Sequence, residues 1–323
     1  MLIRILVLSF AVIFLSLATP ATAAGLRVIE APAGPLRGIV WSPCDAPAGE
    51  ARIRDRVFPG TKDCPVKTGK RPLIVISHRR TGWSGGHHDT AAALADAGFI
   101  VAAIDHPIDS NASKTSRIED IAYLAERPAD IKHLIDFMLG SSPFAANIDP
   151  TRVGFFGFSR GAYTGLVLVG GSPNGELAQA TCAASTEAGS LCEQIRAGKF
   201  PQDYVTDPRI KAAVLADPAP AFIFGREDLK NVSVPVQLWS SERGGRGASA
   251  EATTKIGEAL PSKTSANIVR NAAHFVFLAP CAADALKSES EFCADGAGFD
   301  RTAFHKQFNA DLVAFFRQRL RGD

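Results

Sequence analysis

The feature that most constrains the fold of this chain is an alternation of short apolar runs with segments of helical periodicity. Residues 73–77 and 99–104 are apolar runs, which is typical of strands buried on both faces of a sheet. Residues 90–97, between them, have the pattern of a helix. A strand, a helix and a second strand in this order predict a βαβ unit with two parallel strands.

The alternation continues to the end of the chain. Helices are expected at residues 129–139 and 162–169, with a buried strand at 152–156 between them. Further strands are expected at 26–30 and 36–41, as an opening hairpin, and at 210–216, 234–239 and 266–269. An amphipathic helix, residues 300–320, closes the chain with an apolar stripe of Phe304, Phe308, Leu312, Phe315 and Leu320. This order predicts an α/β fold with a mostly parallel, doubly wound sheet flanked by helices.

The first 23 residues have the pattern of an export signal. Arg4 precedes an apolar run at residues 5–18, and the small-residue site Ala21-Thr22-Ala23 follows. Cleavage there would leave one domain, residues 24–323, in the periplasm or outside the cell. An uncleaved N-terminal anchor is the alternative. No later stretch has the roughly 20 apolar residues of a membrane-spanning helix, so no transmembrane segment is expected after cleavage.

The charge balance argues against strongly charged partners. The chain has 35 Lys and Arg against 33 Asp and Glu, so it generates no strong field of one sign. We therefore expect neither nucleic acid nor an anionic membrane surface as a partner.

Six cysteines fall into three couples of neighbours along the chain. An exported protein can form disulfides, and pairing within each couple closes a short loop outside the expected strands. A zinc site is the alternative, but the close Cys-x-x-Cys spacing of such sites is missing. We therefore expect three local disulfides, within Cys44 and Cys64, Cys182 and Cys192, and Cys281 and Cys293.

The motif that most directly predicts a reaction is Gly157-Phe158-Ser159-Arg160-Gly161. It lies between the strand at 152–156 and the helix at 162–169. This is G-x-S-x-G at a strand-to-helix turn, where a serine projects from the sheet as a nucleophile and the two glycines leave room for the sharp turn. The first N–H groups of the helix point toward a developing oxyanion.

A serine needs a base, which on such a sheet comes from a histidine after the last strand. His274 follows the strand at 266–269, whereas His106, His133 and His305 lie at positions that fit a structural or solvated role better. The acid that orients the base should lie between the serine and the histidine in sequence.

Two carboxylates meet the requirement for the orienting acid. Asp217 follows the strand at 210–216, and Glu242 follows the strand at 234–239. By spacing alone the later strand is the more usual position. Either carboxylate could instead be a loop residue paired with an arginine, such as Arg243.

Three further loop regions contain informative residues. Residues 78–86 follow the strand at 73–77 and are expected to supply backbone N–H groups to the oxyanion. Within and after them, His87, His88 and Asp89 suggest a metal site, but adjacent helical residues point about 100° apart, so the start of a helix fits better. Residues 171–208 form a long polar insertion, either a lid or pocket wall or a plain surface feature.

Taken together, residues 73–107, 149–165 and 213–281 resemble the predicted dienelactone hydrolases related to platelet-activating factor acetylhydrolases, which have the α/β-hydrolase fold. The likeness rests on residues 72–78 and 98–107, on the turn around Ser159, and on Ala273-His274-Phe275-Val276-Phe277-Leu278-Ala279-Pro280-Cys281.

The resemblance implies hydrolysis of a carboxylic ester by a Ser, Asp, His triad without a cofactor or metal. In the acetylhydrolase branch the acid follows the earlier strand, which favours Asp217 over Glu242. The likeness also implies that the N–H groups of Arg80 and Arg160 bind the oxyanion. One position departs from the family, since Arg79 stands where a glycine usually follows the histidine.

The sequence therefore predicts a serine hydrolase acting on a small-molecule or lipid-like ester through an acyl-enzyme. True dienelactone hydrolases use a cysteine nucleophile, so the family name does not give the substrate. A peptidase or amidase using the same triad is an alternative. A catalytically inactive binding module on this fold is another.

Overall fold

The structure is a computed structural model that describes residues 24–30, 36–47, 49–184, 190–281 and 291–322. The expected export signal and the turn of the opening hairpin lie outside the described residues. Within the described ranges, every helix is too short or too polar to cross a membrane.

A nine-stranded sheet forms the centre of the molecule, in the order β11-β10-β9-β8-β6-β7-β2-β1-β5. Neighbouring strands are parallel from β11 to β7, and β2 is antiparallel to both β7 and β1. A separate two-stranded hairpin joins β3 to β4. The strands are β1 (Gly25–Glu30), β2 (Arg37–Ser42), β3 (Glu50–Ile53), β4 (Arg56–Pro59), β5 (Thr61–Lys62), β6 (Arg71–Ser77), β7 (Ile100–Asp105), β8 (Ile148–Phe158), β9 (Ile210–Ala216), β10 (Val236–Ser241) and β11 (Ala266–Val269).

The apolar runs are continuous because the central strands are buried on both faces. In β6, Leu73 and Val75 pack into one apolar cluster, and Ile74 and Ile76 pack into another on the opposite face. Successive side chains of a strand point to opposite faces, so a strand covered on both sides needs apolar residues at every position.

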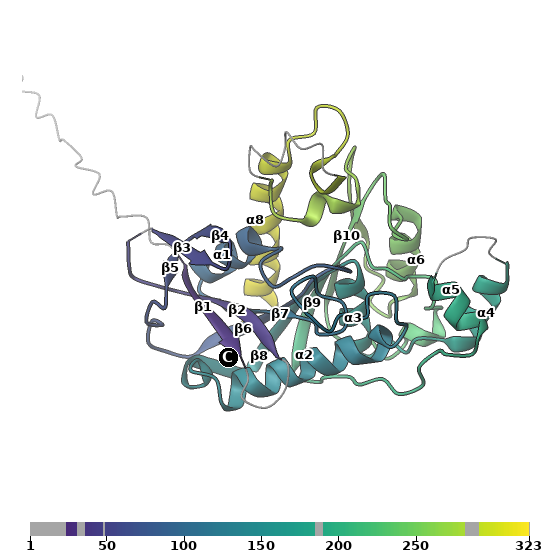
Figure 1. The fold of residues 1–323 in the computed structure, drawn as a ribbon, viewed down its shortest axis with the longest axis horizontal. Helices are drawn as coiled ribbons and strands as arrows, with labels where there is room; N and C mark the ends of the chain where they lie inside the picture. Colours follow the sequence, from purple (N-terminus) through teal and green to yellow (C-terminus); the bar gives the residue numbers. More distant parts are fainter. Residues whose placement is uncertain (1–23, 31–35, 48, 185–189, 282–290, 323) are drawn as a thin grey trace, which may run out of the picture.

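Helices cover the two faces. Side chains of α2, α3 and α6 belong to one apolar cluster, and those of α1 and α8 belong to the other. Figure 1 shows α8 and α1 together on one side of the sheet. The helices are α1 (His88–Asp96), α2 (Tyr123–Gly140), α3 (Arg160–Leu168), α4 (Gly175–Ala184), α5 (Ser190–Arg196), α6 (Ala250–Ala259) and α8 (Arg301–Arg319). The predicted doubly wound fold is confirmed.

The closing helix corrects one detail of the expected stripe. Phe308, Leu312 and Phe316 are fully buried on α8, whereas Phe315 is only partly buried. The buried residues recur every four positions, which is one row of a helix surface. Adjacent phenylalanines both fit a helical period, and the rotation of α8 against the sheet selects Phe316.

The long polar insertion contains two short helices, α4 and α5, which the sequence did not predict. The disulfide between Cys182 and Cys192 joins them. Figure 1 shows the pair at the periphery of the molecule. Gln194 of α5 contacts the segment before α2, where it accepts from the N–H of Ile121 and donates to the carbonyl of Glu119.

The strand order places the loops after β6 and β8 side by side. From β6 the chain passes to β7 on one side and then returns to β8 on the other. The two parallel strands pair along most of their length, up to Ser77 beside Gly157. In sheets of this kind ligands bind beyond the carboxyl ends of the strands, where the winding direction reverses.

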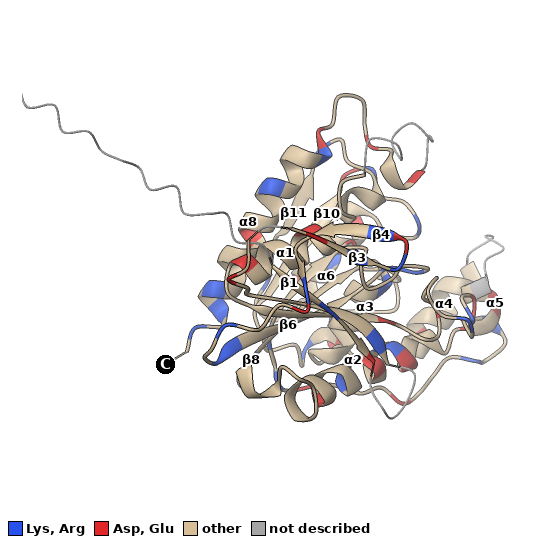
Figure 2. Cartoon of the chain, turned by 60° about the vertical axis from the view of Figure 1, so that its left-hand side comes forward, with Lys and Arg blue, Asp and Glu red and all other residues tan. Residues whose placement is uncertain are grey.

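Charged side chains are distributed over the whole chain. Figure 2 shows Lys and Arg interspersed with Asp and Glu along the chain. The nearly equal numbers of basic and acidic residues lead us to expect this.

Candidate active site

Ser159 occupies a sharp turn between β8 and α3. Its backbone is in a region that favours glycine, with φ 57° and ψ −118°. A side chain at Gly157 would meet the carbonyl of Gly161 at 2.2 Å, and one at Gly161 would meet the carbonyl of Ser77 at 1.9 Å. The two glycines are therefore required by close backbone contacts, and the strained turn presents the serine hydroxyl at the end of the sheet.

His274 comes from the segment after β11 and meets this hydroxyl. Its Nε2 lies 3.1 Å from Ser159 Oγ, and its Nδ1 lies 2.9 Å from Asp217 Oδ2. A carboxylate can only accept, so Nδ1 carries the hydrogen and Nε2 is free to accept from the serine. The N–H of His274 also donates to the carbonyl of Gly244, 3.0 Å away, which fixes the segment beside β10.

Asp217 is fully buried directly after β9 and accepts four hydrogen bonds. Besides His274, the donors are the hydroxyl of Ser240 (2.8 Å) and the N–H and hydroxyl of Ser241 (2.9 and 2.6 Å). These contacts fill the lone pairs of the carboxylate and leave it one orientation. The two serines end the neighbouring strand, and their roles depend on strand pairing that the sequence did not specify.

Glu242 lies elsewhere, on the surface. It accepts from Arg270 at 2.6 Å and from the N–H of Asn271 at 2.8 Å, and it makes no contact with His274. The structure therefore places it as a loop carboxylate paired with an arginine.

The loop after β6 packs against the start of α3. Arg80 lies in this loop, and Arg160 follows Ser159 at the first position of the helix. The backbone N–H groups of both arginines donate to no acceptor among the described residues. The N–H of Arg160 directly follows the serine in the chain, and the loop that carries Arg80 contacts the same turn through the carbonyls of Ser77 and His78.

A buried arginine that sequence reasoning missed holds this loop in place. Arg127 of α2 donates to the carbonyl of His78, to the hydroxyl of Ser77 at 3.1 Å and to Asp109 at 2.5 Å. Asp109 in turn accepts from Arg160 at 3.0 Å. The signal was present, because Arg127 lies on the apolar side of α2, where a charged side chain requires buried partners.

Two buried histidines, one in this loop and one behind it, have lowered pKa values. Burial and the nearby Arg127 guanidinium lower the pKa of His78 to about 4 and that of His106 well below its ordinary value. His106 contacts Ser77 at 2.8 Å and Asp130 at 2.9 Å. Burial also raises the pKa of Asp130 to about 7.

Two of the residues that suggested a metal site form hydrogen bonds with distant parts of the chain. Asp89 of α1 accepts from His305 of α8 at 2.6 Å, and His87 contacts the carbonyl of Phe277 at 3.0 Å. Among the described residues, no group of three or more His, Cys, Asp or Glu side chains is arranged to hold a metal ion.

The cysteines form the three local disulfides: Cys44 with Cys64, Cys182 with Cys192, and Cys281 with Cys293. The third is close to the candidate site. It fixes Phe292, whose ring lies 4.8 Å from that of Phe275, the neighbour of His274.

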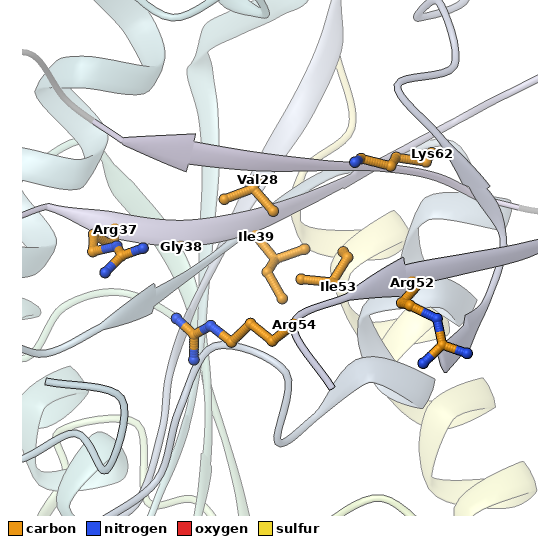
Figure 3. A pocket seen from close by; sticks show the side chains of 8 residues that line it. All are labelled: Val28, Arg37, Gly38, Ile39, Arg52, Ile53, Arg54 and Lys62. Carbon is orange, nitrogen blue, oxygen red and sulfur yellow. The ribbon is translucent and has the colours of Figure 1, made fainter. Parts of the chain in front are cut away.

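A cavity of about 140 Å³ lies away from this cluster (Figure 3). It is formed by β1, β2 and the β3-β4 hairpin, and its lining includes neither Ser159 nor His274. The chemistry of the serine, histidine and aspartate therefore defines the candidate site better than cavity shape does.

The strand order, the serine turn after β8 and the histidine after β11 together define the α/β-hydrolase fold. Among solved structures, a ferulic acid esterase from Streptomyces cinnamoneus has a TM-score of 0.63 and 18% sequence identity, covering 95% of this chain and 93% of its own. At this identity the likeness shows the fold. No protein-family model and no curated protein matches the chain.

Proposed function

We propose that this protein hydrolyses carboxylic esters with Ser159 as nucleophile, His274 as base and Asp217 as the acid that orients the base. The observation that supports this most is the continuous hydrogen-bonded chain from Ser159 through His274 to Asp217. All three side chains are at most 5% exposed, so they are shielded from competing water contacts.

In the proposed reaction, Ser159 Oγ attacks the ester carbonyl as its proton passes to His274 Nε2. The N–H groups of Arg80 and Arg160 stabilise the oxyanion, and His274 then gives the proton to the departing alcohol. Water, activated by the same histidine, attacks the acyl-enzyme and releases the acid while the serine regains its proton.

Two further observations support an esterase. The chain resembles the predicted dienelactone hydrolases related to platelet-activating factor acetylhydrolases, and a solved structure with the same fold is named a ferulic acid esterase. We also propose that the protein is exported to the periplasm or secreted, because three disulfides suit an oxidising compartment.

Replacing the nucleophile tests the proposal. Ser159→Ala should lower kcat for para-nitrophenyl esters by several orders of magnitude while preserving the circular dichroism spectrum. The wild type should also be labelled by a fluorophosphonate probe, and the variant should not. Turnover of aminoacyl amides without ester turnover would favour a peptidase or amidase. Absence of both labelling and turnover would favour an inactive binding module.

A further inference from the structure

Arg79 is the arginine that stands where the resembling family usually has glycine, and its guanidinium lies against two neighbouring aromatic rings. Its Cζ atom lies 5.2 Å from the ring centre of Phe275 and 4.5 Å from that of Phe292. Its Nη1 donates to the carbonyl of Arg80 at 2.5 Å and to the hydroxyl of Thr81 at 2.7 Å. The side chain is therefore held by the two rings and at one nitrogen.

The opposite edge of this guanidinium has no partner among the described residues. Arg79 Nε is buried without a hydrogen-bond partner, and no hydrogen bond of Nη2 or ion pair of Arg79 is found among the described residues. Nε–H and Nη2–H point in parallel from one edge of a guanidinium, in the fork geometry that binds both oxygens of a carboxylate. A buried donor on a cation without an acceptor is costly and calls for an explanation.

The neighbouring arginines differ because each has a carboxylate. Arg80 pairs with Glu119 and Arg246 pairs with Glu291. Arg160 pairs with the buried Asp109 and stacks on Tyr123, 3.7 Å from its ring centre. Their charges are balanced by ion pairs. The charge of Glu291 also opposes the lowering of the Arg79 pKa by burial, but among the described residues Arg79 forms no ion pair of its own.

Arg79 lies one residue or one ring away from the groups proposed to react. The preceding residue, His78, has its carbonyl 3.0 Å from where a side chain at Gly161 would begin, at the turn that carries Ser159. On the other side, the Phe275 ring under Arg79 is next to the imidazole of His274, with ring centres 5.3 Å apart.

We propose that Arg79 binds a carboxylate carried by the substrate, so that the favoured esters are half-esters of dicarboxylic acids or esters whose alcohol part carries a free carboxylate. This inference rests on the proposed ester hydrolysis. It explains why one edge of the guanidinium has no partner among the described residues, the aromatic rings that hold it and its position one ring away from His274.

The experiment compares kcat/KM within two matched pairs of esters. Mono(para-nitrophenyl) glutarate against para-nitrophenyl pentanoate places the carboxylate on the acyl side. Para-acetoxybenzoate against its methyl ester places it on the alcohol side. In at least one pair the wild type should prefer the anionic ester, and that pair identifies the side of the ester that Arg79 contacts.

The Arg79→Gln variant should lower this preference by about 10-fold to 100-fold, mainly through KM, as expected for a hydrogen bond between two charged groups. Arg79→Lys should retain part of it, because the charge remains but the fork is lost. Arg319→Gln is the matched control. Arg319 is exposed at the end of α8, so its replacement removes one positive charge without altering the preference.

A preference that is absent from the wild type, or unchanged in Arg79→Gln, would overturn the inference. Hydrolysis of neutral esters without an anionic preference leaves the proposed function intact, whereas failure to hydrolyse any ester refutes that function itself. If Arg79→Gln does not fold, inhibition of the wild type gives the answer. Glutarate should then inhibit neutral-ester hydrolysis more strongly than pentanoate, and equal inhibition contradicts the inference.

Discussion

At the scale of single residues, the candidate site depends on one carboxylate in a saturated set of hydrogen bonds. Asp217 receives donors from His274, Ser240 and Ser241 and is inaccessible to solvent. Such a carboxylate holds one imidazole tautomer in place and stabilises the imidazolium that forms during attack.

Replacing the two candidate acids should therefore give very different results. Asp217→Asn should lower kcat by about 10⁴, because an amide can donate to His274 Nδ1 and so favours the wrong tautomer. Glu242→Gln should leave kcat near that of the wild type, since this carboxylate binds Arg270 on the surface. Steady-state kinetics on one neutral ester measures both, and a reversed order would assign the role to Glu242.

At the scale of elements, α2 and the loop after β6 form one unit through Arg127. This buried side chain connects the helix to the carbonyl of His78 and to Asp109. The position of the loop, and with it the Arg80 N–H, therefore depends on a helix that makes no proposed contact with substrate.

Removing this connection should destabilise the protein. Arg127→Met should lower the free energy of unfolding by about 3 kcal/mol, because it leaves Asp109 buried with one partner fewer. Urea unfolding measures the effect. Arg117→Met is the control, because Arg117 forms ion pairs with Asp120 and Glu126 that are exposed and therefore contribute little to stability. Equal midpoints for the two variants would show that Arg127 does not hold the loop.

At the scale of the whole molecule, buried histidines make stability depend on pH. Burial lowers the pKa of His78 to about 4 and of His87 to about 3, from an ordinary value of 6.5, and lowers that of His106 as well. Below about pH 6.5 the unfolded chain binds protons that the folded protein excludes, so acidification favours unfolding. Burial raises the pKa of Asp130 to about 7, so the folded protein binds a proton there at a pH where the unfolded chain does not. This opposes the effect of the histidines, but only by one proton.

The free energy of unfolding should therefore decrease as the pH falls from 7 toward 4. Each histidine contributes a slope of about 1.4 kcal/mol per pH unit within its own range. His87→Gln should reduce the slope, since an amide does not titrate yet can still donate to the carbonyl of Phe277. His133→Gln, exposed on α2, is the control. Urea titrations between pH 4 and 7 measure the slopes, and a stability that rises on acidification would contradict this account.

The sequence by itself determined most of the strands of the large sheet and the helices that cover it, the serine turn and the histidine after the last strand. These features follow from local causes, because the period of apolar residues and the steric demands of glycine at positions 157 and 161 act within a few residues. Spacing alone favoured Glu242, after the later strand, and only the resemblance to a family favoured Asp217.

The tertiary structure decided which groups meet. Whether Asp217 or Glu242 lies beside His274 depends on the order of β9, β10 and β11 in the sheet. The choice of Phe316 over Phe315 depends on how α8 rotates against the sheet, and the role of Arg127 depends on a loop 49 residues away in sequence. Such contacts join distant parts of the chain, and no local pattern of residues specifies them.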